Sequence, residues 1–302
     1  MIQTKDLTKV FKLGKKDKKE IIAVEALTLN VSEGEVFGFL GPNGAGKTTT
    51  IRMLACLISP TEGTATVAGY DIRSDPIKVR ESIGILTENP SLYERLTAYE
   101  NMDFFAAAYG IKTSDERQQR IRELLDFFNL WDRRNDKVAT FSKGMKQKLA
   151  IVRAIVHRPP VLFLDEPTAG LDPESAKEIR DLMFQLSQHE KRTILLCTHH
   201  LEDAEKLCKR VLIMNKGRCI LTGSPNELRD KINPQPVLEI ELTKVSSIVL
   251  NAIKNENYAK EVKVKDQENI IAVSVGDARV DTPKIVRTIV EAQGQILSVK
   301  LL

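Results

Sequence analysis

Hydrophobic and polar positions along this chain follow two different periods, and each change of period marks a predicted element. Between residues 21 and 40, β-branched and aromatic residues form strand-like runs that end at a glycine-rich turn. Apolar residues at Ile51, Leu54 and Leu57 then follow at helical spacing. Further on, the runs VLFLD and TILLCT are short and continuously apolar, as in strands buried within a parallel sheet. This alternation predicts an α/β core.

The middle of the chain, residues 85 to 157, has almost entirely helical spacing, which predicts a helical subdomain inserted into the α/β core. Helix starts recur in this region and before it. Asp75 precedes Pro76 as an N-cap precedes a first turn, and residues 97–100 read T-x-x-E, the pattern of a capping box. The helix that begins there is expected to end at Gly110.

After the prolines of the stretch INPQPVLEIEL, the pattern changes to strand, helix, two strands, helix and strand. This βαββαβ order is that of the ferredoxin-like split unit, and it predicts a small α+β domain over residues 234–302, after a first domain over residues 1–230. The alternative is a strand-and-helix extension packed onto the first domain. Near the start, the lysine-rich residues 12–20 predict a solvated hairpin tip, with contact to anionic lipid as the alternative.

Composition excludes few classes of function. The net charge of +4 comes from 45 basic and 41 acidic residues, an excess too small to indicate nucleic-acid binding by itself. No apolar run approaches the roughly 20 residues of a membrane-spanning helix, so any membrane contact is expected to be peripheral or through a partner. The cysteines have no metal-like spacing, which favours small buried side chains in a reduced cytosolic compartment: Cys56, Cys197, Cys208 and Cys219.

Residues 41–48, GPNGAGKT, match the phosphate-binding pattern G-x-x-x-x-G-K-[ST] where a strand is expected to turn into a helix. Glycines let successive backbone N–H groups and the helix N-terminus face phosphate oxygens. Lys47 is expected to neutralise charge on the β- and γ-phosphates, and the Thr48 hydroxyl to ligate Mg²⁺. The expected phosphate-binding residues are Gly41, Pro42, Asn43, Gly44, Ala45, Gly46, Lys47, Thr48 and Thr49.

A nucleoside triphosphatase also needs a carboxylate near the metal and a group that orients the attacking water. The strand run VLFLDEP ends with both. Asp165 is expected to hold the metal directly or through its second shell, and Glu166 is the candidate general base. Taken alone, this pair would as readily be a capping pair at the end of a strand. Downstream of a phosphate-binding loop, the two acids predict a Mg²⁺-dependent triphosphatase.

The segments GPNGAGKT, FSKGMKQK, VLFLDEPTAGLD and CTHH occur in the order found in the nucleotide-binding subunit of ABC transporters, which residues 1–230 therefore resemble. Bacterial subunits of ABC-2-type exporters, including drug-resistance and sodium-efflux systems, are similar in character and carry similar C-terminal appendages. The resemblance implies a P-loop NTPase core, ATP and Mg²⁺ as cofactors, membrane permease subunits, and a second ATPase subunit, identical or different. It also implies a cytoplasmic location, peripheral on the inner face of the cell membrane.

FSKGM occupies the place of this family's signature motif, usually L-S-G-G-Q, which grips the γ-phosphate of ATP held by the other subunit. The resemblance therefore assigns Ser142, Lys143 and Gly144 to that phosphate. Ser142 and Gly144 are also expected to open a helix that runs to about His157, and a helix N-terminus favours an anion. Lys143 and Met145 depart from the usual motif, as in related exporters. Nucleic acid is not expected to bind these lysines, because aromatic stacking platforms are lacking nearby.

Other positions are assigned by resemblance alone. Phe11 stands where an aromatic residue stacks on adenine, with a core strand aromatic as the alternative. Asp172 matches the D-loop at the dimer interface and is equally a good N-cap for a helix beginning at Pro173. His199 matches the switch histidine that contacts the γ-phosphate, in preference to His200. The remaining histidines are expected to be ordinary surface or helix residues: His157 and His189.

Glu88 is the largest departure from the family, whose members usually have a glutamine that reaches Mg²⁺ and water. Glutamate has the same reach and ligates Mg²⁺, but it adds negative charge near the phosphates. Catalytic rate, metal preference or coupling to the membrane subunit is therefore expected to change. The apolar residues that follow either line the groove for a permease's coupling helix or pack in the core: Leu92, Tyr93, Leu96 and Tyr99.

Two other classes of protein are weighed as alternatives. A soluble ABC-type ATPase that acts on ribosomes or DNA is disfavoured, because the chain has one motif set and no extended heptad pattern. A nucleotide-regulated scaffold without turnover is disfavoured because Glu166 and His199 are both present. The transported substrate is not predicted, because selectivity for it resides in the membrane subunits. Export as the direction of transport is expected from the resemblance alone.

Overall fold

The chain divides into two compact units, Met1–Pro225 and Asn226–Leu302, each with a core of its own. The break falls at the start of helix α8 (Pro225–Ile232), earlier along the chain than the linker expected near residue 234. Each unit is described by itself. The computed structural model describes residues 1–13, 19–87, 91–188, 190–232, 236–265 and 269–301.

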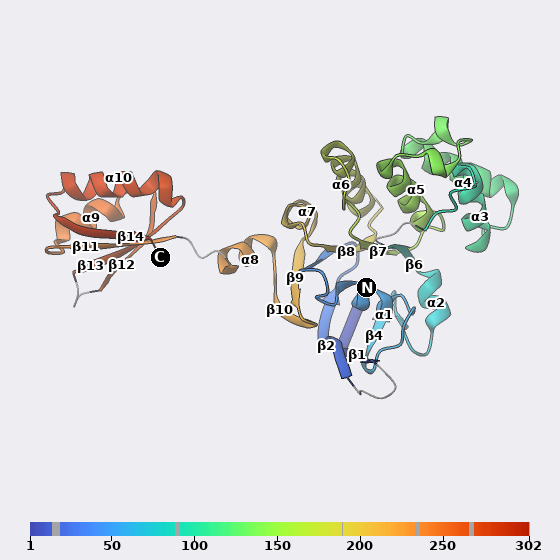
Figure 1. Ribbon diagram of the computed structural model, residues 1–302, viewed down its shortest axis with the longest axis horizontal. Helices are drawn as coiled ribbons and strands as arrows, with labels where there is room; N and C mark the ends of the chain where they lie inside the picture. Colours follow the sequence, from blue (N-terminus) through green and yellow to red (C-terminus); the bar gives the residue numbers. More distant parts are fainter. Residues whose placement is uncertain (14–18, 88–90, 189, 233–235, 266–268, 302) are drawn as a thin grey trace. The chain divides into compact units, whose positions relative to one another are not determined.

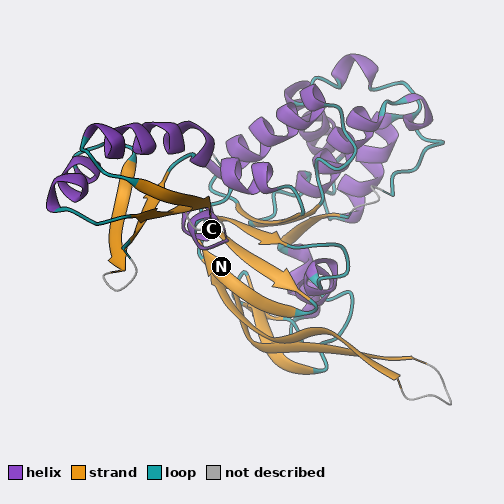
Figure 2. Ribbon diagram, turned by 60° about the vertical axis from the view of Figure 1, so that its left-hand side comes forward, coloured by secondary structure: helices purple, strands orange, loops and turns teal. Residues whose placement is uncertain are grey.

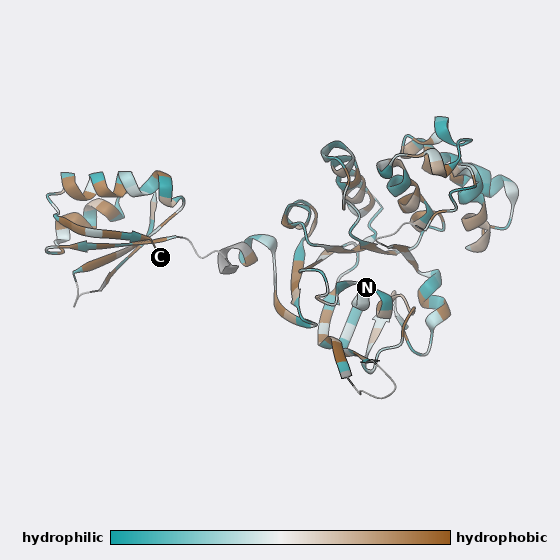
Figure 3. Ribbon diagram, viewed as in Figure 1, coloured by the Kyte–Doolittle hydropathy of each residue, from teal (hydrophilic) through white to brown (hydrophobic). Residues whose placement is uncertain are grey.

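The first unit contains a central, mainly parallel sheet (Figure 1). In spatial order its strands are β10 (Arg218–Gly223), β9 (Arg210–Asn215), β3 (Val36–Leu40), β8 (Thr193–Thr198), β7 (Val161–Asp165) and β6 (Ile83–Leu86). Only the pairing of β10 with β9 is antiparallel within this described sheet. β3, β7 and β8 are buried along their whole length and are mostly hydrophobic in Figure 3, as their apolar runs predict.

A second sheet of this unit is antiparallel. In spatial order its strands are β2 (Lys19–Val31), β1 (Ile2–Leu13), β4 (Glu62–Val67) and β5 (Tyr70–Asp71). Lys12 pairs with Glu20 where β1 and β2 converge, and residues 14–18 of the lysine-rich segment lie outside the described part of the chain. One hydrophobic core joins both sheets to helix α1 (Lys47–Leu54), with Ile2, Phe39 and Ile51 among its fully buried side chains.

The helices of the first unit include a group that forms the predicted helical subdomain, gathered on one side of the central sheet (Figures 1 and 2). Thr97 caps α3 with a complete capping box together with Glu100, and Gly110 follows the last turn at a φ of +91°, so both predictions for this helix are confirmed. Within the predicted range lie α3 (Ala98–Ala108), α4 (Ser114–Phe127) and α5 (Lys143–Ile155), with 3₁₀ turns at Trp131–Arg133 and Val138–Thr140. Outside that range, the first unit also contains α2 (Pro76–Glu81), α6 (Pro173–Gln188) and α7 (Leu201–Leu207).

The second unit has the predicted βαββαβ order. Its elements are β11 (Val237–Leu242), α9 (Ser247–Lys254), β12 (Ala259–Lys265), β13 (Ile270–Val275), α10 (Ala278–Glu291) and β14 (Ile296–Leu301). The strand order β12-β13-β11-β14, antiparallel throughout the described pairs, is that of a ferredoxin-like fold. Figure 2 shows both helices on one face of the sheet, where Ile240, Ile271 and Ile285 are fully buried.

Candidate nucleotide-binding site

The carboxyl ends of β3, β7 and β8 lie at one edge of the central sheet because the three strands are parallel neighbours. The chain leaves β3 through residues 41–46 and enters α1 at Lys47, as the phosphate-binding pattern predicts. Gly46 has a φ of +111°, and a Cβ there would lie 2.4 Å from the Ala23 carbonyl oxygen, so a larger residue is excluded. Gly44 also has a positive φ of +78°, but it faces open space.

A cavity of about 630 Å³ opens above this loop, a volume typical of small-molecule sites. The predicted loop residues from Pro42 to Thr49 line it, together with Asp165, Glu166 and His199. The loop wraps one side of the cavity with backbone N–H groups and places the N-terminus of α1 beneath it, an arrangement suited to phosphate. Five lining residues were not predicted: Ile21, Ile22, Ala23, Ala169 and Lys216.

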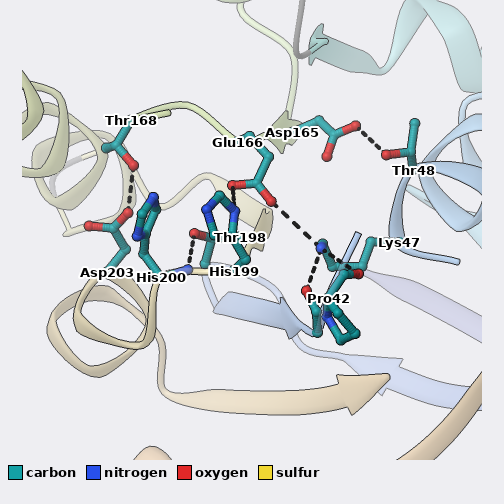
Figure 4. A network of polar contacts seen from close by, with 11 residues as sticks. Pro42, Lys47, Thr48, Asp165, Glu166, Thr168, Thr198, His199, His200 and Asp203 are labelled. Atoms are coloured by element: carbon teal, nitrogen blue, oxygen red, sulfur yellow. Dashed lines mark hydrogen bonds and ion pairs between the residues drawn. The ribbon is translucent and has the colours of Figure 1, made fainter. Parts of the chain in front are cut away.

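Thr48 and Asp165, which the sequence predicts as metal ligands, lie next to each other at the cavity. The Thr48 hydroxyl donates to Asp165 Oδ2 at 2.8 Å, so the two oxygens already converge (Figure 4). No group of three or more His, Cys, Asp or Glu side chains with metal-binding geometry occurs in the described part of the chain. Mg²⁺ takes only one or two protein oxygens when phosphates and waters supply the rest, so these two donors fit that ion.

Lys47 is buried at the floor of the cavity between backbone oxygens and a carboxylate. Its Nζ donates to the Gly41 carbonyl oxygen at 2.6 Å and the Pro42 carbonyl oxygen at 3.4 Å, and it lies 3.6 Å from Glu166 Oε1. That carboxylate oxygen is buried and accepts no hydrogen bond from any described residue. The ammonium is therefore held where phosphate charge would arrive.

Glu166 is paired with His199. The histidine Nδ1 lies 2.9 Å from Glu166 Oε2, and Figure 4 shows the imidazole turned toward the carboxylate. Glu166 directly follows β7 with a φ of +52°, held by its N–H donating to the Cys197 carbonyl oxygen of β8 at 2.9 Å. His200, the rival histidine, occupies the N-cap position of α7 and does not line the described cavity. A buried carboxylate oriented by an imidazole is suited to accept a proton from water.

The signature segment lies on α5, away from the lining of this cavity. Ser142 is the N-cap of α5, and its Oγ accepts the Met145 N–H at 3.2 Å, as predicted for a helix start. Gly144 is buried, whereas Lys143 is exposed with its ammonium beside Gly170. The N-terminus of α5 is therefore presented at the surface rather than to the chain's own phosphate-binding loop.

Three further predicted residues have different outcomes. Asp172 caps α6, because its Oδ1 accepts the Ser175 N–H at 2.9 Å, and this hydrogen bond lowers the pKa of the exposed carboxyl. Phe11 is 39% exposed and does not line the described cavity, although β-pairing places it opposite Ile21, which does. Glu88 lies outside the described residues.

An aromatic patch lies on the helical subdomain: Tyr93 and Phe104, which are exposed, and Phe105, which is half-buried. Tyr93 and Phe104 meet edge to face with ring centroids 5.3 Å apart, and the Arg153 guanidinium lies over Phe105 at 5.1 Å. The sequence leaves Tyr93 open between such a surface and the core, and its exposure agrees with the surface; its partners on α3 were missed. Asn101 fixes the loop that carries Tyr93, since its side chain bonds both the N–H and the carbonyl of Tyr93. Leu92, Leu96 and Tyr99 are half-buried.

Comparison with known proteins identifies relatives over most of the chain. A family model described as "ABC transporter" matches residues 24–169. The linearmycin resistance ATP-binding protein LnrL of Bacillus subtilis is 35% identical over 274 residues, or 91% of this chain and 85% of the relative. The ABC transporter ATP-binding protein NatA of the same species is 39% identical over 231 residues, or 76% of this chain and 93% of the relative.

A solved structure matches the fold. The dimeric post-hydrolysis state of the ATP-binding cassette MJ0796, bound to ADP and Pi, superposes with a TM-score of 0.69 at 29% identity, over 74% of this chain and 99% of that one. The match therefore supports the P-loop NTPase core predicted from the sequence. No helix among the described residues is long and apolar enough to cross a membrane.

Proposed function

The chain belongs to the ABC transporter ATP-binding proteins, and from this premise we propose how its residues bind ATP, hydrolyse it and act on a membrane partner. It is an ATP-binding subunit that hydrolyses ATP in transport, and the ribosomal or DNA-acting alternative is not supported. The observation that carries the residue-level proposal is the convergence of Lys47, Glu166 and His199 on one cavity beside the Thr48–Asp165 pair.

ATP is proposed to bind with its phosphates in residues 41–49. The loop N–H groups and the N-terminus of α1 receive the phosphate oxygens, and Lys47 moves from its backbone acceptors and Glu166 to the β- and γ-phosphates. Thr48 ligates Mg²⁺, and Asp165 holds it directly or through water. Bound Mg²⁺ neutralises charge that builds up on the phosphates.

Hydrolysis is proposed to use Glu166 as the general base. A water molecule attacks the γ-phosphorus, Glu166 accepts the proton of that water, and ADP leaves as the bond to the γ-phosphate breaks. His199 is hydrogen-bonded to Glu166 and steadies both the carboxylate and the γ-phosphate. Departure of Lys47 from Glu166 on ATP binding frees the carboxylate for this step.

The active form is proposed to be a head-to-tail dimer. ABC ATP-binding subunits dimerise, and in this chain the N-terminus of α5 is presented away from the chain's own cavity. Ser142, Lys143 and Gly144 are proposed to contact the γ-phosphate of ATP bound by the second subunit, with Asp172 at the interface. Binding of two ATP molecules then favours the closed dimer, and hydrolysis reopens it.

Membrane coupling is proposed to occur through the aromatic patch. ABC ATP-binding subunits work with membrane permeases, and solvent-exposed aromatic side chains that pack on one another are typical anchors of protein interfaces. We place the subunit on the cytoplasmic face of the cell membrane. Export is the proposed direction, since LnrL is a resistance protein and the motif variants are those of exporter subunits.

Two further contacts complete the proposal. Phe11 stacks on the adenine ring beside Ile21 and Ile22, which line the open side of the cavity. Glu88 occupies the place of the usual glutamine and contacts Mg²⁺ or its water, so its extra charge tunes the metal site. No nucleic-acid partner is proposed.

The test is the exchange Glu166→Gln, which keeps the size of the side chain and removes the base. We expect ATP binding to persist, phosphate release to fall by at least about 100-fold, and the protein to accumulate as a dimer with ATP. Steady-state phosphate release and light scattering after size exclusion measure both effects. Glu123→Gln, at an exposed glutamate of α4, is the control and should behave as the wild type. Wild-type turnover in Glu166→Gln would remove this residue from the role of base.

A further inference from the structure

The loop that follows Glu166, residues 167–171, is tied to the helices on both sides of it by buried side chains. On one side, Gln147 of α5 donates from Nε2 to the Pro167 carbonyl oxygen at 2.8 Å. The Gln147 side chain is 5% exposed, and Pro167 directly follows the proposed base. Because a buried carbonyl that loses its donor is costly, this bond fixes the backbone next to Glu166 relative to α5.

On the other side, the loop is tied to α7. Asp203 lies in the first turn of α7 and accepts a hydrogen bond from Thr168 Oγ1 at 2.5 Å (Figure 4). It also accepts one from Arg180 Nη1 of α6 at 2.9 Å. Its side chain is only 3% exposed, so both donors are needed to compensate its buried charge. α7 begins two residues after His199. The Thr168–Asp203 bond therefore joins the loop after Glu166 to the helix after His199.

The loop has little freedom to absorb movement between these two attachments. The Ala169 N–H donates to the Glu166 carbonyl oxygen at 3.2 Å, and the Leu171 N–H donates to the Thr168 carbonyl oxygen at 3.3 Å. These successive turns follow Glu166, whose backbone is in the left-handed region and whose N–H donates to the Cys197 carbonyl oxygen of β8. A short segment bonded in this way shifts as one piece when a neighbouring helix moves.

We infer that Gln147 is a positioning residue that couples the two ATP sites of the dimer, and that the Thr168–Asp203 pair positions His199 relative to Glu166, an inference that rests on the proposed function. The helix α5 carries Ser142, which acts on ATP bound by the second subunit, whereas Glu166 and His199 act on ATP bound by their own subunit. When the second subunit's ATP engages the N-terminus of α5, Gln147 carries the displacement to Pro167 and sets the position of Glu166. Through its bond to Thr168, Asp203 moves α7 with the loop, so His199 keeps its position relative to Glu166.

The opposing account is that these contacts only hold the helices together, and Lys148 provides a matched comparison. Lys148 is the next residue on α5, and its Nζ lies 2.8 Å from Glu178 of α6, so its loss weakens helix packing without removing the bond to Pro167. Gln147→Met keeps the length of the side chain and removes the donor. Thr168→Val removes the hydroxyl that Asp203 accepts, whereas Thr168→Ser keeps it.

The experiment measures kcat, KM and the Hill coefficient for ATP with the full-length chain, and ATP-driven dimerisation of each variant in the Glu166→Gln background. Gln147→Met is expected to lower kcat about tenfold, with KM within about twofold of the wild type and a Hill coefficient near 1. Thr168→Val is expected to lower kcat about tenfold with the Hill coefficient unchanged, and Thr168→Ser to restore it. Lys148→Gln should match the wild type, and all variants should dimerise.

The inference is overturned if Gln147→Met matches Lys148→Gln in kcat and Hill coefficient, if Thr168→Ser is as impaired as Thr168→Val, or if the wild type itself has a Hill coefficient of 1. Should Gln147→Met fail to fold, Gln147→Glu has the same length and no donor, and the same criteria apply to it. Absence of ATP hydrolysis by the wild type, or of dimerisation by Glu166→Gln alone, would contradict the proposed function instead.

Discussion

At the scale of single residues, Glu166 concentrates features that cost stability. A φ of +52° is uncommon for a residue with a side chain, and its carboxylate is 9% exposed with one oxygen that no described donor reaches. Strain and incomplete pairing of this kind persist where the surrounding structure enforces them, chiefly at functional sites. Lys47 at 3.6 Å partly offsets the buried charge, and ATP would draw that ammonium away. The unfavourable features are therefore those that a poised base needs.

The residues of the candidate site differ in how far the sequence predicts them. The phosphate-binding loop is predictable residue by residue because consecutive N–H groups and one lysine bind one ligand. The bonds from Gln147 to Pro167 and from Thr168 to Asp203 join residues 20 and 35 positions apart, and no local pattern states which side chains meet after folding. Ile21 enters the cavity through strand register for the same reason.

A residue-scale prediction concerns Phe104, which is 49% exposed and meets Tyr93 edge to face. If the aromatic patch binds the permease, Phe104→Ser removes an anchor of that interface and leaves the ATP site untouched. We expect recovery of a polytopic membrane protein with the tagged subunit to fall at least about tenfold, while ATPase activity of the isolated subunit stays within about twofold. Gentle solubilisation of native membranes followed by quantitative co-purification measures the effect.

Phe127→Ser is the matched control for that experiment, because Phe127 is also 49% exposed but lies on α4 outside the patch. It should leave permease recovery unchanged. Equal recovery with both variants would show that the patch is not the permease surface. Recovery of ribosomes or DNA in place of a membrane protein would move the proposed work of this ATPase to the cytosol.

At the scale of elements, helix starts and buried strands could be predicted because their signals lie within a few consecutive residues. The capping box at Thr97 formed as expected, and the helix expected to open at Ser142 begins there. Asp75 shows the limit of such signals. It occupies the N-cap position of α2, but its carboxylate makes no cap bond and instead accepts hydrogen bonds from Ser74 and Lys78. The neighbouring donors Ser74 and Lys78 therefore engage the carboxylate in place of the N–H groups of the first helical turn.

His157, beyond the end of α5, departs from the ordinary histidine expected there. Its Nε2 lies 3.0 Å from the Ile83 carbonyl oxygen, and Tyr109 stacks on its ring with centroids 3.8 Å apart. Burial, together with the nearby charges of Arg192 and Arg120, lowers its pKa to about 4, against the raising effect of the Ile83 hydrogen bond. The ring is therefore neutral in the folded protein at pH 7.

This low pKa predicts how stability depends on pH. Between pH 6.5 and about 4 the unfolded chain binds a proton at His157 and the folded protein does not, so stability falls as the pH is lowered through this window. The loss from this residue is about 2 kcal/mol, reduced from the full shift because the ring is partly exposed. Denaturant unfolding of the wild type and of His157→Gln at pH 7.5 and 4.5 measures it.

Glutamine can donate to the same carbonyl but does not titrate, so His157→Gln should lose less stability between the two pH values than the wild type does. Carboxylates elsewhere contribute equally to both proteins and cancel in the difference. An identical pH dependence of the two proteins would mean that His157 titrates alike in the folded and unfolded chains.

At the scale of the whole molecule, the fold class of each unit could be predicted, because segments with strand-like and helical spacing of apolar residues alternate along the chain. The βαββαβ order of the second unit follows from the strands and helices between Val237 and Leu301, and antiparallel pairing then leaves few arrangements. The position of the break was less predictable. α8 belongs with the second unit by contacts, whereas the prolines that suggested the linker come after it.

A separate core predicts that residues 236–302 fold alone. Pro236 belongs in the fragment because its carbonyl accepts the Val275 N–H at 3.0 Å. We expect a cooperative thermal transition by circular dichroism, of modest stability because so small a domain has a limited core. Ile285→Ala, at a fully buried position, should cost about 2–5 kcal/mol and abolish that transition, whereas Ile248→Ala, at a side chain 69% exposed, should change the free energy of unfolding by less than about 0.5 kcal/mol. A fragment without a cooperative transition, or one equally sensitive at both isoleucines, would mean that this core does not sustain the fold by itself.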